Sequence, residues 1–130
     1  MLAQSKAVAF LGAADLDRAR AFYEGVLGLP ILSQDELMVT AEAGGVSIRI
    51  TQPQAVDPQR YTVLGFDVQD IGAKVAGLTA RGVIFEHYSF FGDAQDALGV
   101  WTAPGGRRVA WFKDPDGNLL SLAEAALDQA

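Results

Sequence analysis

The sequence predicts an α+β fold made of two copies of a βαβββ module. Three observations support this prediction. A strand-length apolar run precedes a helical pattern that starts at an aspartate and stops at a glycine. The same order returns after roughly fifty residues, and short segments with strand patterning follow each helix. A unit that occurs only twice indicates duplication, because solenoids need three or more copies.

The first module begins with an apolar run at residues 7–12 that has the length of a strand. Asp15 follows as a candidate N-cap, since its carboxylate can accept a hydrogen bond from a free N–H group of the first helical turn. Apolar residues then recur at helical spacing: Leu16, Ala19, Phe22, Val26 and Leu27. Gly28 is a suitable residue to end this helix, and Pro30 prevents the helix from continuing.

Three short strands are predicted next, at residues 30–33, 36–42 and 46–52. The last of them alternates in polarity, so its polar side chains share one face: Ser47, Arg49 and Thr51. Its apolar side chains share the other face: Val46, Ile48 and Ile50. Such alternation is typical of a sheet with one packed and one polar face.

The second module repeats this order. A strand at residues 61–69 leads to Asp70, a second candidate N-cap, and to a helix that ends at Gly82. The segments that follow are a predicted strand at 83–88, a loop at 89–98 and a strand at 99–103.

Residues 53–60 have no apolar periodicity and carry proline, aspartate and glutamine, so we expect a linker there. Half of the residues are hydrophobic, which is enough to bury a core in one compact unit. The chain is therefore expected to be a single domain over residues 1–130, with modules at about 5–53 and 60–125.

The last two strands form a hairpin whose register follows from its turn, Asp114-Pro115-Asp116-Gly117. Proline presets φ at the first central position of a type I turn, and the glycine can adopt the left-handed conformation that closes a three-residue loop. Counting back along both strands pairs Phe112 with Leu120 and Trp111 with Ser121. Trp111 and Ser121 should then share the face opposite the apolar pair.

Composition excludes several classes of function. The formal net charge is −6, and a nucleic-acid partner is not expected because phosphate binding relies on clustered lysine and arginine. The absence of cysteine excludes disulfide scaffolds, thiolate metal sites and cysteine nucleophiles. The N-terminal residues do not resemble a signal peptide, and no apolar run reaches the ~18 residues of a membrane span. We expect a cytoplasmic protein with no membrane partner.

Two motifs resemble the glyoxalase, bleomycin-resistance and extradiol-dioxygenase superfamily, also called the vicinal oxygen chelate superfamily. The first runs from Asp15 to Tyr23 and continues with Leu27-Gly28-Leu29, and the second runs from Phe112 to Leu120. The resemblance implies that the two modules form an open, cup-shaped incomplete barrel with the helices outside, and that the cup holds a ligand. It also implies a homodimer, which would help to cover the sheet edges.

Many members of this superfamily hold a divalent metal through four side chains, usually His, His or Gln, Glu and Glu. The corresponding positions here are occupied by Val8, Arg49, Val63 and Ser121. Valine has no donor atom, arginine repels a cation, and serine alone is a poor ligand. We therefore predict no metal and no other cofactor, which removes the main reason to expect glyoxalase, epimerase or dioxygenase chemistry.

The resemblance places the candidate ligand-binding residues on the inner face of the cup: Arg49, Trp111, Ser121, Ser47, Thr51, Val63, Asp67, Phe10 and Trp101. Arg49 has two interpretations, as the partner of Asp67 or another carboxylate, or as a binding group for an anionic ligand. Trp111 is explained equally well as core or as pocket lining. An acidic protein suits a cationic ligand whereas Arg49 suits an anionic one, so the ligand charge stays open.

Other polar or aromatic features have ordinary explanations. His87 is the only histidine, and we interpret it as a strand or rim residue because no partner for metal binding or proton transfer is placed near it. Turn chemistry explains the spacing of Asp114 and Asp116. The aromatic loop at 88–93 is either a lid over the cup or part of a subunit interface.

The first function hypothesis is a metal-free protein of the bleomycin-resistance type that binds a small organic molecule. One alternative is a lyase, isomerase or dioxygenase-like enzyme of the same superfamily that uses no metal, or recruits one through residues such as Asp67 and His87. Another is a dimeric scaffold with a vestigial pocket, which a pocket filled by the chain's own side chains would favour.

Overall fold

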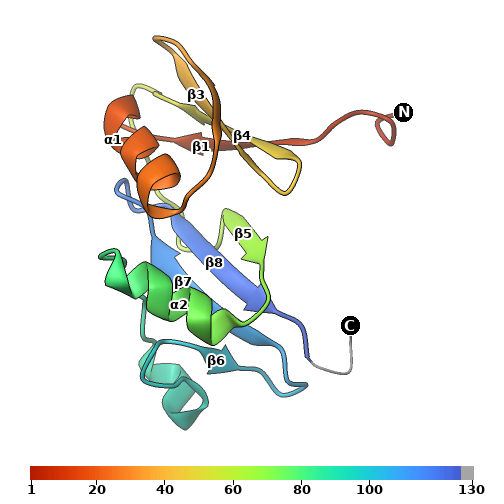
Figure 1. Ribbon diagram of the computed structural model, residues 1–130, viewed down its shortest axis with the longest axis vertical. Helices are drawn as coiled ribbons and strands as arrows, with labels where there is room; N and C mark the ends of the chain where they lie inside the picture. Colours follow the sequence, from red (N-terminus) through yellow and green to blue (C-terminus); the bar gives the residue numbers. More distant parts are fainter. Residues whose placement is uncertain (127–130) are drawn as a thin grey trace. The chain divides into compact units, whose positions relative to one another are not determined.

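The structure is a computed structural model that describes residues 1–126 of the chain. The chain divides into two compact units (Figure 1). Unit 1 consists of Met1–Pro58 together with Pro115–Asn118, and unit 2 consists of Gln59–Asp114 together with the chain from Leu119 onward. No helix within residues 1–126 is both long and apolar enough to cross a membrane.

Unit 1 contains one four-stranded sheet and one helical segment. Its elements are β1 (Val8–Gly12), α1 (Leu16–Arg20), the π-helical turn η1 (Ala21–Val26), β2 (Ile31–Gln34), β3 (Met38–Ala43) and β4 (Val46–Thr51). The strand order is β1-β4-β3-β2. The first strand runs parallel to the last one, and the other neighbours are antiparallel. We call this sheet A.

Unit 2 repeats this topology in a second sheet, which we call sheet B. Its elements are β5 (Leu64–Asp67), α2 (Ile71–Ala80), the 3-10 helix η2 (Ser89–Ala94), β6 (Trp101–Thr102), β7 (Arg108–Lys113) and β8 (Leu119–Glu124). The strand order is β5-β8-β7-β6, again with the first and last strands parallel. The predicted α+β fold and its duplicated βαβββ order are therefore confirmed.

Both helices begin at the predicted aspartates. The Asp15 carboxylate accepts a hydrogen bond from the Arg18 N–H at 3.1 Å, and the Asp70 carboxylate accepts one from the Ala73 N–H at 3.4 Å. Gly28 follows the first helical segment in the left-handed region, at φ +76°. These local signals could be recognised in the sequence because capping involves only residues three positions apart.

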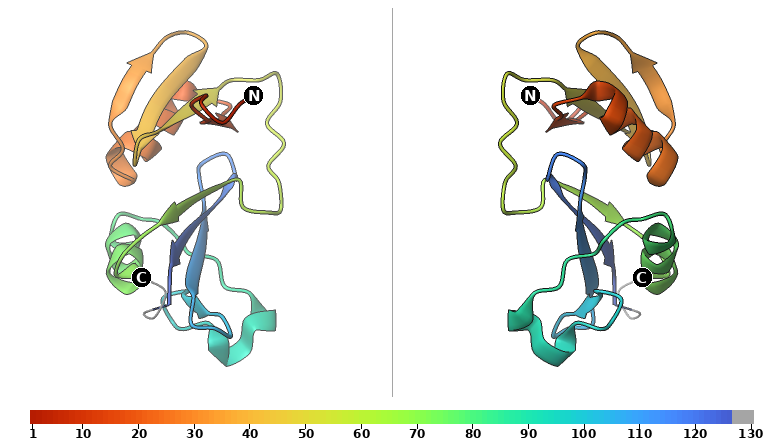
Figure 2. Two further views of the ribbon diagram at one scale, coloured as in Figure 1. Left: turned by 90° about the vertical axis from the view of Figure 1, so that its right-hand side faces the viewer. Right: turned by 90° about the vertical axis from the view of Figure 1, so that its left-hand side faces the viewer.

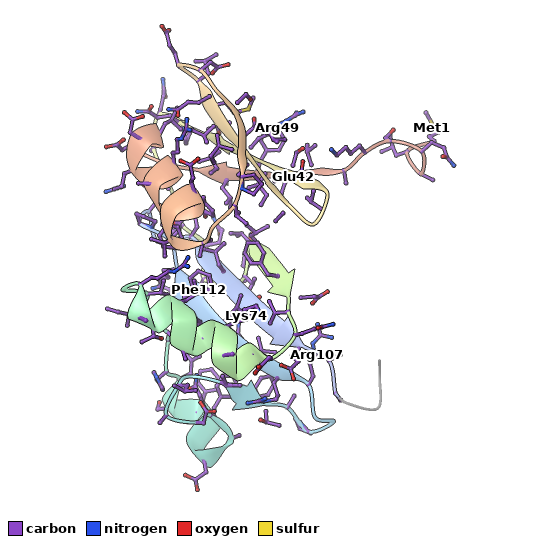
Figure 3. All side chains as sticks on the ribbon, viewed as in Figure 1. Met1, Glu42, Arg49, Lys74, Arg107 and Phe112 are labelled. Atoms are coloured by element: carbon purple, nitrogen blue, oxygen red, sulfur yellow. The ribbon has the colours of Figure 1, made fainter. Side chains whose placement is uncertain are left out.

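The face of each sheet that carries its helix is apolar and buried. On this face of unit 1 the buried strand residues are Leu11, Val39, Ala41, Ile48 and Ile50, and the buried helical residues are Leu16, Ala19 and Tyr23. In unit 2 they are Ala110, Phe112, Leu120 and Leu122, with Ile71 and Val75 on α2. Phe112 (Figure 3) is fully buried on the helix side of sheet B. The opposite face of each sheet, which we call its open face, carries the polar and aromatic residues considered below.

The predicted hairpin register is confirmed. Phe112 pairs with Leu120 and Trp111 pairs with Ser121 across β7 and β8. Gly117 has φ +88°, the left-handed conformation that the turn requires. Trp111 and Ser121 are therefore neighbours on the open face of sheet B.

Other strand predictions need correction. Residues 83–88 do not form a strand. Their pairing with β7 is limited to the bridge between Phe85 and Phe112 and the hydrogen bond from the Glu86 N–H to the Trp111 carbonyl at 2.8 Å. Val83 and Phe85 are buried while Ile84 is 84% exposed, so buried and exposed side chains alternate as predicted. The segment nevertheless lacks a continuous partner strand. The predicted strand at 99–103 is reduced to β6, and the predicted loop at 89–98 contains the helix η2.

Candidate functional site

The predicted ligand-binding residues divide between the two units. Phe10, Ser47, Arg49 and Thr51 belong to sheet A, where β1 and β4 lie side by side with Phe10 opposite Arg49. Those of unit 2 are Val63, Asp67, Trp101, Trp111 and Ser121. Each unit therefore presents its own set of candidate residues, and all of them lie on its sheet except Val63, which directly precedes β5.

Five aromatic residues of unit 2 form what we call the aromatic cluster: Tyr88, Phe90, Phe91, Trp101 and Trp111. The Phe91 ring stacks on Trp101 with the ring centres 4.6 Å apart and on Trp111 with the centres 5.5 Å apart. The two indole rings are 5.9 Å apart. Phe91 therefore covers both tryptophans at once.

Tyr88 and Phe90 extend this cluster outward. The Tyr88 ring meets Trp111 edge-on at 5.7 Å and stacks against Phe90 at 5.5 Å. Phe90 is 78% exposed, whereas the other members are half-buried. Burial raises the pKa of the Tyr88 phenol above its usual value of 10.0, and the nearby Glu86 carboxylate raises it further. Tyr88 is thus a neutral hydroxyl donor beside the rings.

The cluster is held by a short network around Gln95. Its side-chain oxygen accepts a hydrogen bond from the Tyr88 N–H at 2.8 Å, and its amide nitrogen donates to the carbonyls of Glu86 and Gly99 at 2.9 and 3.0 Å. The Asp96 carboxylate accepts bonds from the Leu98 and Val100 N–H groups. Figure 2 shows η2 and β6 at the same end of unit 2. The segment that carries Phe90 and Phe91 is therefore fixed by hydrogen bonds at its base.

Arg49 lies on the open face of sheet A. Its guanidinium group is 5.7 Å from the centre of the Phe10 ring, a cation–π arrangement. Among the residues that the structure describes, no carboxylate lies within 4.0 Å of its nitrogen atoms. Asp67, which the sequence suggested as a partner, instead pairs with Arg107 of its own unit at 3.8 Å.

The superfamily's metal positions do not fit a divalent ion here. Val8 pairs with Ser47 in sheet A and Ser121 pairs with Gly65 in sheet B, so apolar and hydroxyl groups stand where the usual ligands are expected. Nowhere in residues 1–126 do three histidine, aspartate or glutamate residues gather in a metal-binding group. Glu124, the carboxylate nearest to Ser121 along β8, accepts a hydrogen bond from the Ile71 N–H and so caps α2.

The other polar residues singled out in the sequence are His87 and the aspartates of the hairpin turn. His87 is exposed and is not part of a regular strand. Asp116 also makes contacts outside its turn. Its carboxylate accepts hydrogen bonds from the Ala14 N–H at 2.9 Å and from the Arg18 guanidinium at 2.8 Å. Asn118 adds a bond to the Gly12 carbonyl at 2.9 Å.

Sequence reasoning missed an open depression of about 420 Å³ beside the start of α1. It is lined mainly by acidic and amide side chains: Asp15, Asp17, Gln34, Asp35, Glu36 and Gln52. Its residues come from α1, β2 and the ends of neighbouring strands, so no sequence motif could have marked it. The Asp17 and Gln34 side chains are hydrogen-bonded to each other at 3.1 Å.

The two matching sheets, each with a helix on one face and a polar or aromatic open face, define the duplicated βαβββ class of proteins. The model of the Glyoxalase/Bleomycin resistance protein/Dioxygenase superfamily matches residues 7–122, and the chain belongs to this superfamily. No protein of curated function matches the chain by sequence.

Solved structures with the same fold include three informative examples. A fosfomycin resistance protein, FosX, from Listeria monocytogenes is 17% identical, with a TM-score of 0.75 and 97% of each chain covered. TnmS3, an antibiotic binding protein from Streptomyces sp. CB03234, is 22% identical, with a TM-score of 0.74 and coverage of 97% and 99%. A lactoylglutathione lyase from Agrobacterium tumefaciens is 21% identical, with a TM-score of 0.73 and coverage of 95% and 96%. At these identities the likeness concerns the fold.

Proposed function

We propose that the chain binds a small organic molecule with a flat, unsaturated ring system, and that the aromatic cluster supplies the binding surface. The observation that carries the proposal is the stacking of Phe91 on both Trp101 and Trp111. Within residues 1–126, no group of three histidine or acidic side chains gathers to hold a metal ion beside them. A flat ring can replace Phe91 on the indoles or extend the stack over Tyr88 and Phe90. Each aromatic contact contributes about 0.5–1.5 kcal/mol beyond buried area.

Two further facts support this proposal. Gly92, next to Phe91, has φ +54° and ψ −133°, a conformation open to glycine alone, and it marks a kink where the ring could swing away. One protein with the same fold is an antibiotic binding protein and another is a fosfomycin resistance protein, so this architecture is compatible with small-molecule binding. The proposed binding needs no metal, because valine, arginine and serine occupy the superfamily's ligand positions.

Tryptophan fluorescence tests the proposal directly, since the only two tryptophans of the chain lie in the cluster. Titration with 2-(hydroxymethyl)anthraquinone, a neutral flat probe, and with bleomycin should give saturable quenching by at least one of them. Trp111→Leu should weaken that binding about tenfold, the loss of one or two ring contacts. Tyr61→Leu is the matched control, because Tyr61 is an exposed aromatic residue of the same unit outside the cluster.

Circular dichroism of each variant shows whether it is folded. Absence of saturable quenching with both probes, in wild type and in a folded Phe91→Ala variant, contradicts the proposal. That result would favour a purely structural cluster, since the tryptophans then bind neither probe even after the Phe91 ring is removed.

Measuring the melting temperature with Mn²⁺, Ni²⁺, Zn²⁺ and Fe²⁺ distinguishes the proposed binding protein from the alternative, a metal-dependent lyase, isomerase or dioxygenase. A metal-free binding protein gains no saturable stabilisation from any of them, because stabilisation requires binding to the folded state. A divalent ion retained in stoichiometric amount after dialysis would support the enzyme instead.

A further inference from the structure

We infer that the open face of sheet A binds an anionic group, a carboxylate, sulfonate or phosphonate, attached to a flat apolar body. Arg49 would pair with the anion, and Phe10 would contact the apolar body. All residues involved belong to unit 1, so this inference stands on observations separate from the aromatic cluster of unit 2. Either proposal can fail without the other.

The surroundings of the Arg49 charge support this inference. Arginine on a half-buried sheet face is normally paired with a carboxylate, because removing its charge from water without a partner is costly. Here Arg49 is half-buried as a residue, and within the described part of the chain its charge meets the Phe10 ring rather than an acid. The planar fork of guanidinium donors matches the two oxygen atoms of a carboxylate or phosphonate.

Hydroxyl groups surround this charge on the same face. Thr40 of β3 is the direct cross-strand neighbour of Arg49, and Ser47 and Thr51 lie two residues away along β4. Thr40 and Ser47 are only 8% exposed, and neither is an acid. Hydroxyl groups can donate to an oxyanion without competing with it for the guanidinium. A small anion would therefore meet the Arg49 cation and the half-buried Thr51 hydroxyl, while the buried Thr40 and Ser47 add no opposing charge.

Phe10 supplies the apolar part of the surface. It pairs directly with Arg49 across β1 and β4, and its side chain is 58% exposed although it lies within a regular strand. An exposed ring next to an arginine held against it can contact an aromatic ligand body while the guanidinium takes the charged group. This pairing favours an aromatic or otherwise flat acid over a free inorganic anion.

Glu42 is the charged residue that opposes anion binding. It sits opposite Ser47 on β3, two residues from the cross-strand neighbour of Arg49 and on the same open face. Figure 3 shows Arg49 and Glu42 on neighbouring strands of sheet A. Because like charges repel, removing the Glu42 charge should strengthen binding of an anion and leave a neutral ligand unaffected.

The test compares 2-naphthoate with the neutral 2-naphthylmethanol, which carries the same ring system. Isothermal titration calorimetry gives the dissociation constants, and ¹⁵N-resolved NMR shifts locate the binding. Wild type should bind naphthoate at least about fivefold more tightly, as expected for a charge-assisted bidentate pair. The shifts should fall on β1 and β4.

Variants identify the residue responsible. Arg49→Gln should weaken naphthoate binding about tenfold, and Arg49→Lys severalfold, since lysine keeps the charge but not the planar fork. Lys6→Gln is the matched control: it removes the same charge from an exposed position of the same unit and should change affinity less than about twofold. Glu42→Gln should strengthen binding of naphthoate alone, by about two- to fivefold.

Equal affinity for the two naphthyl probes overturns the inference, as does a folded Arg49→Gln variant that binds naphthoate like wild type. Shifts confined to residues 88–111 also overturn it, because they assign the probe to the aromatic cluster and hence to the proposed function. Failure of anthraquinone quenching in unit 2, by contrast, leaves the result for Arg49 unaffected.

Discussion

At the scale of single residues, the chemistry of the aromatic cluster centres on Tyr88. Its hydroxyl is the one titratable group among the five rings, and partial burial together with the Glu86 carboxylate disfavours the phenolate. The folded state therefore holds the phenolic proton more tightly than the unfolded state does, and the folded pKa lies above 10.0. This difference gives the stability of the protein a specific dependence on alkaline pH.

We predict that the free energy of unfolding decreases as pH rises above about 10, where the unfolded chain releases the Tyr88 proton and the folded chain does not. The stability that Tyr88 contributes through its proton is fully present below the pKa of the unfolded state. It is lost as the pH rises through the pKa of the folded state. Urea denaturation between pH 8 and 11 measures the slope. Tyr88→Phe should make it shallower, whereas the exposed control Tyr61→Phe should not. Equal slopes for the two variants contradict the prediction.

At the scale of elements, the Gln95 side chain holds the backbone of the segment from residue 86 to residue 99 in place. Gln95 makes three hydrogen bonds to backbone groups, and these join the chain before η2 to the chain after it. Half-buried backbone groups that lose their partners destabilise the fold by about 1–3 kcal/mol. The geometry of Phe91 against the tryptophans follows from this network.

Gln95→Leu keeps the side-chain volume and removes all three bonds. We expect a loss of about 1–3 kcal/mol in stability and, more specifically, faster hydrogen exchange at residues 86–100 together with greater acrylamide quenching of tryptophan fluorescence. Gln69→Leu, which changes an exposed glutamine of the same unit, is the control. An unchanged exchange rate at Tyr88 N–H would show that the network does not hold the segment.

The features that could be predicted from the sequence are those decided by interactions between residues close together in the chain. The helix caps at Asp15 and Asp70 and the hairpin register could be derived from sequence because each is decided within a few residues. The alternation from Val83 onward predicts a strand that the structure does not contain. Alternation shows which side chains are buried, but it does not show whether a partner strand lies alongside. Trp111 was a candidate residue, but its contact with Phe91 depends on η2 and Gln95, which no local pattern reveals.

At the scale of the whole molecule, each sheet leaves two edge strands: β1 and β2 in sheet A, β5 and β6 in sheet B. Unpaired edge groups favour association with another strand. The exposed apolar side chain of Leu32 on β2 adds to this tendency. We therefore propose a homodimer.

Sedimentation velocity should show a species of about twice the 13.8 kDa chain mass at micromolar concentration, and dilution should convert it reversibly to the monomer. A single 13.8 kDa species up to the highest soluble concentration contradicts the proposal. Repeating the measurement in 1 M salt separates apolar contacts from charge contacts, because salt screens only the latter.

The pairing of first and last strands in each sheet also constrains how the chain matures during synthesis. Among the described strands, β5 pairs in sheet B with β8 alone, and β8 ends at Glu124. Unit 1 includes residues 115–118, where the Asn118 side chain donates a hydrogen bond to the Gly12 carbonyl. A ribosome-bound chain that stops before residue 115 thus lacks part of both units. Such long-range closure slows folding. The nascent protein would depend on protection from aggregation until its last strand emerges.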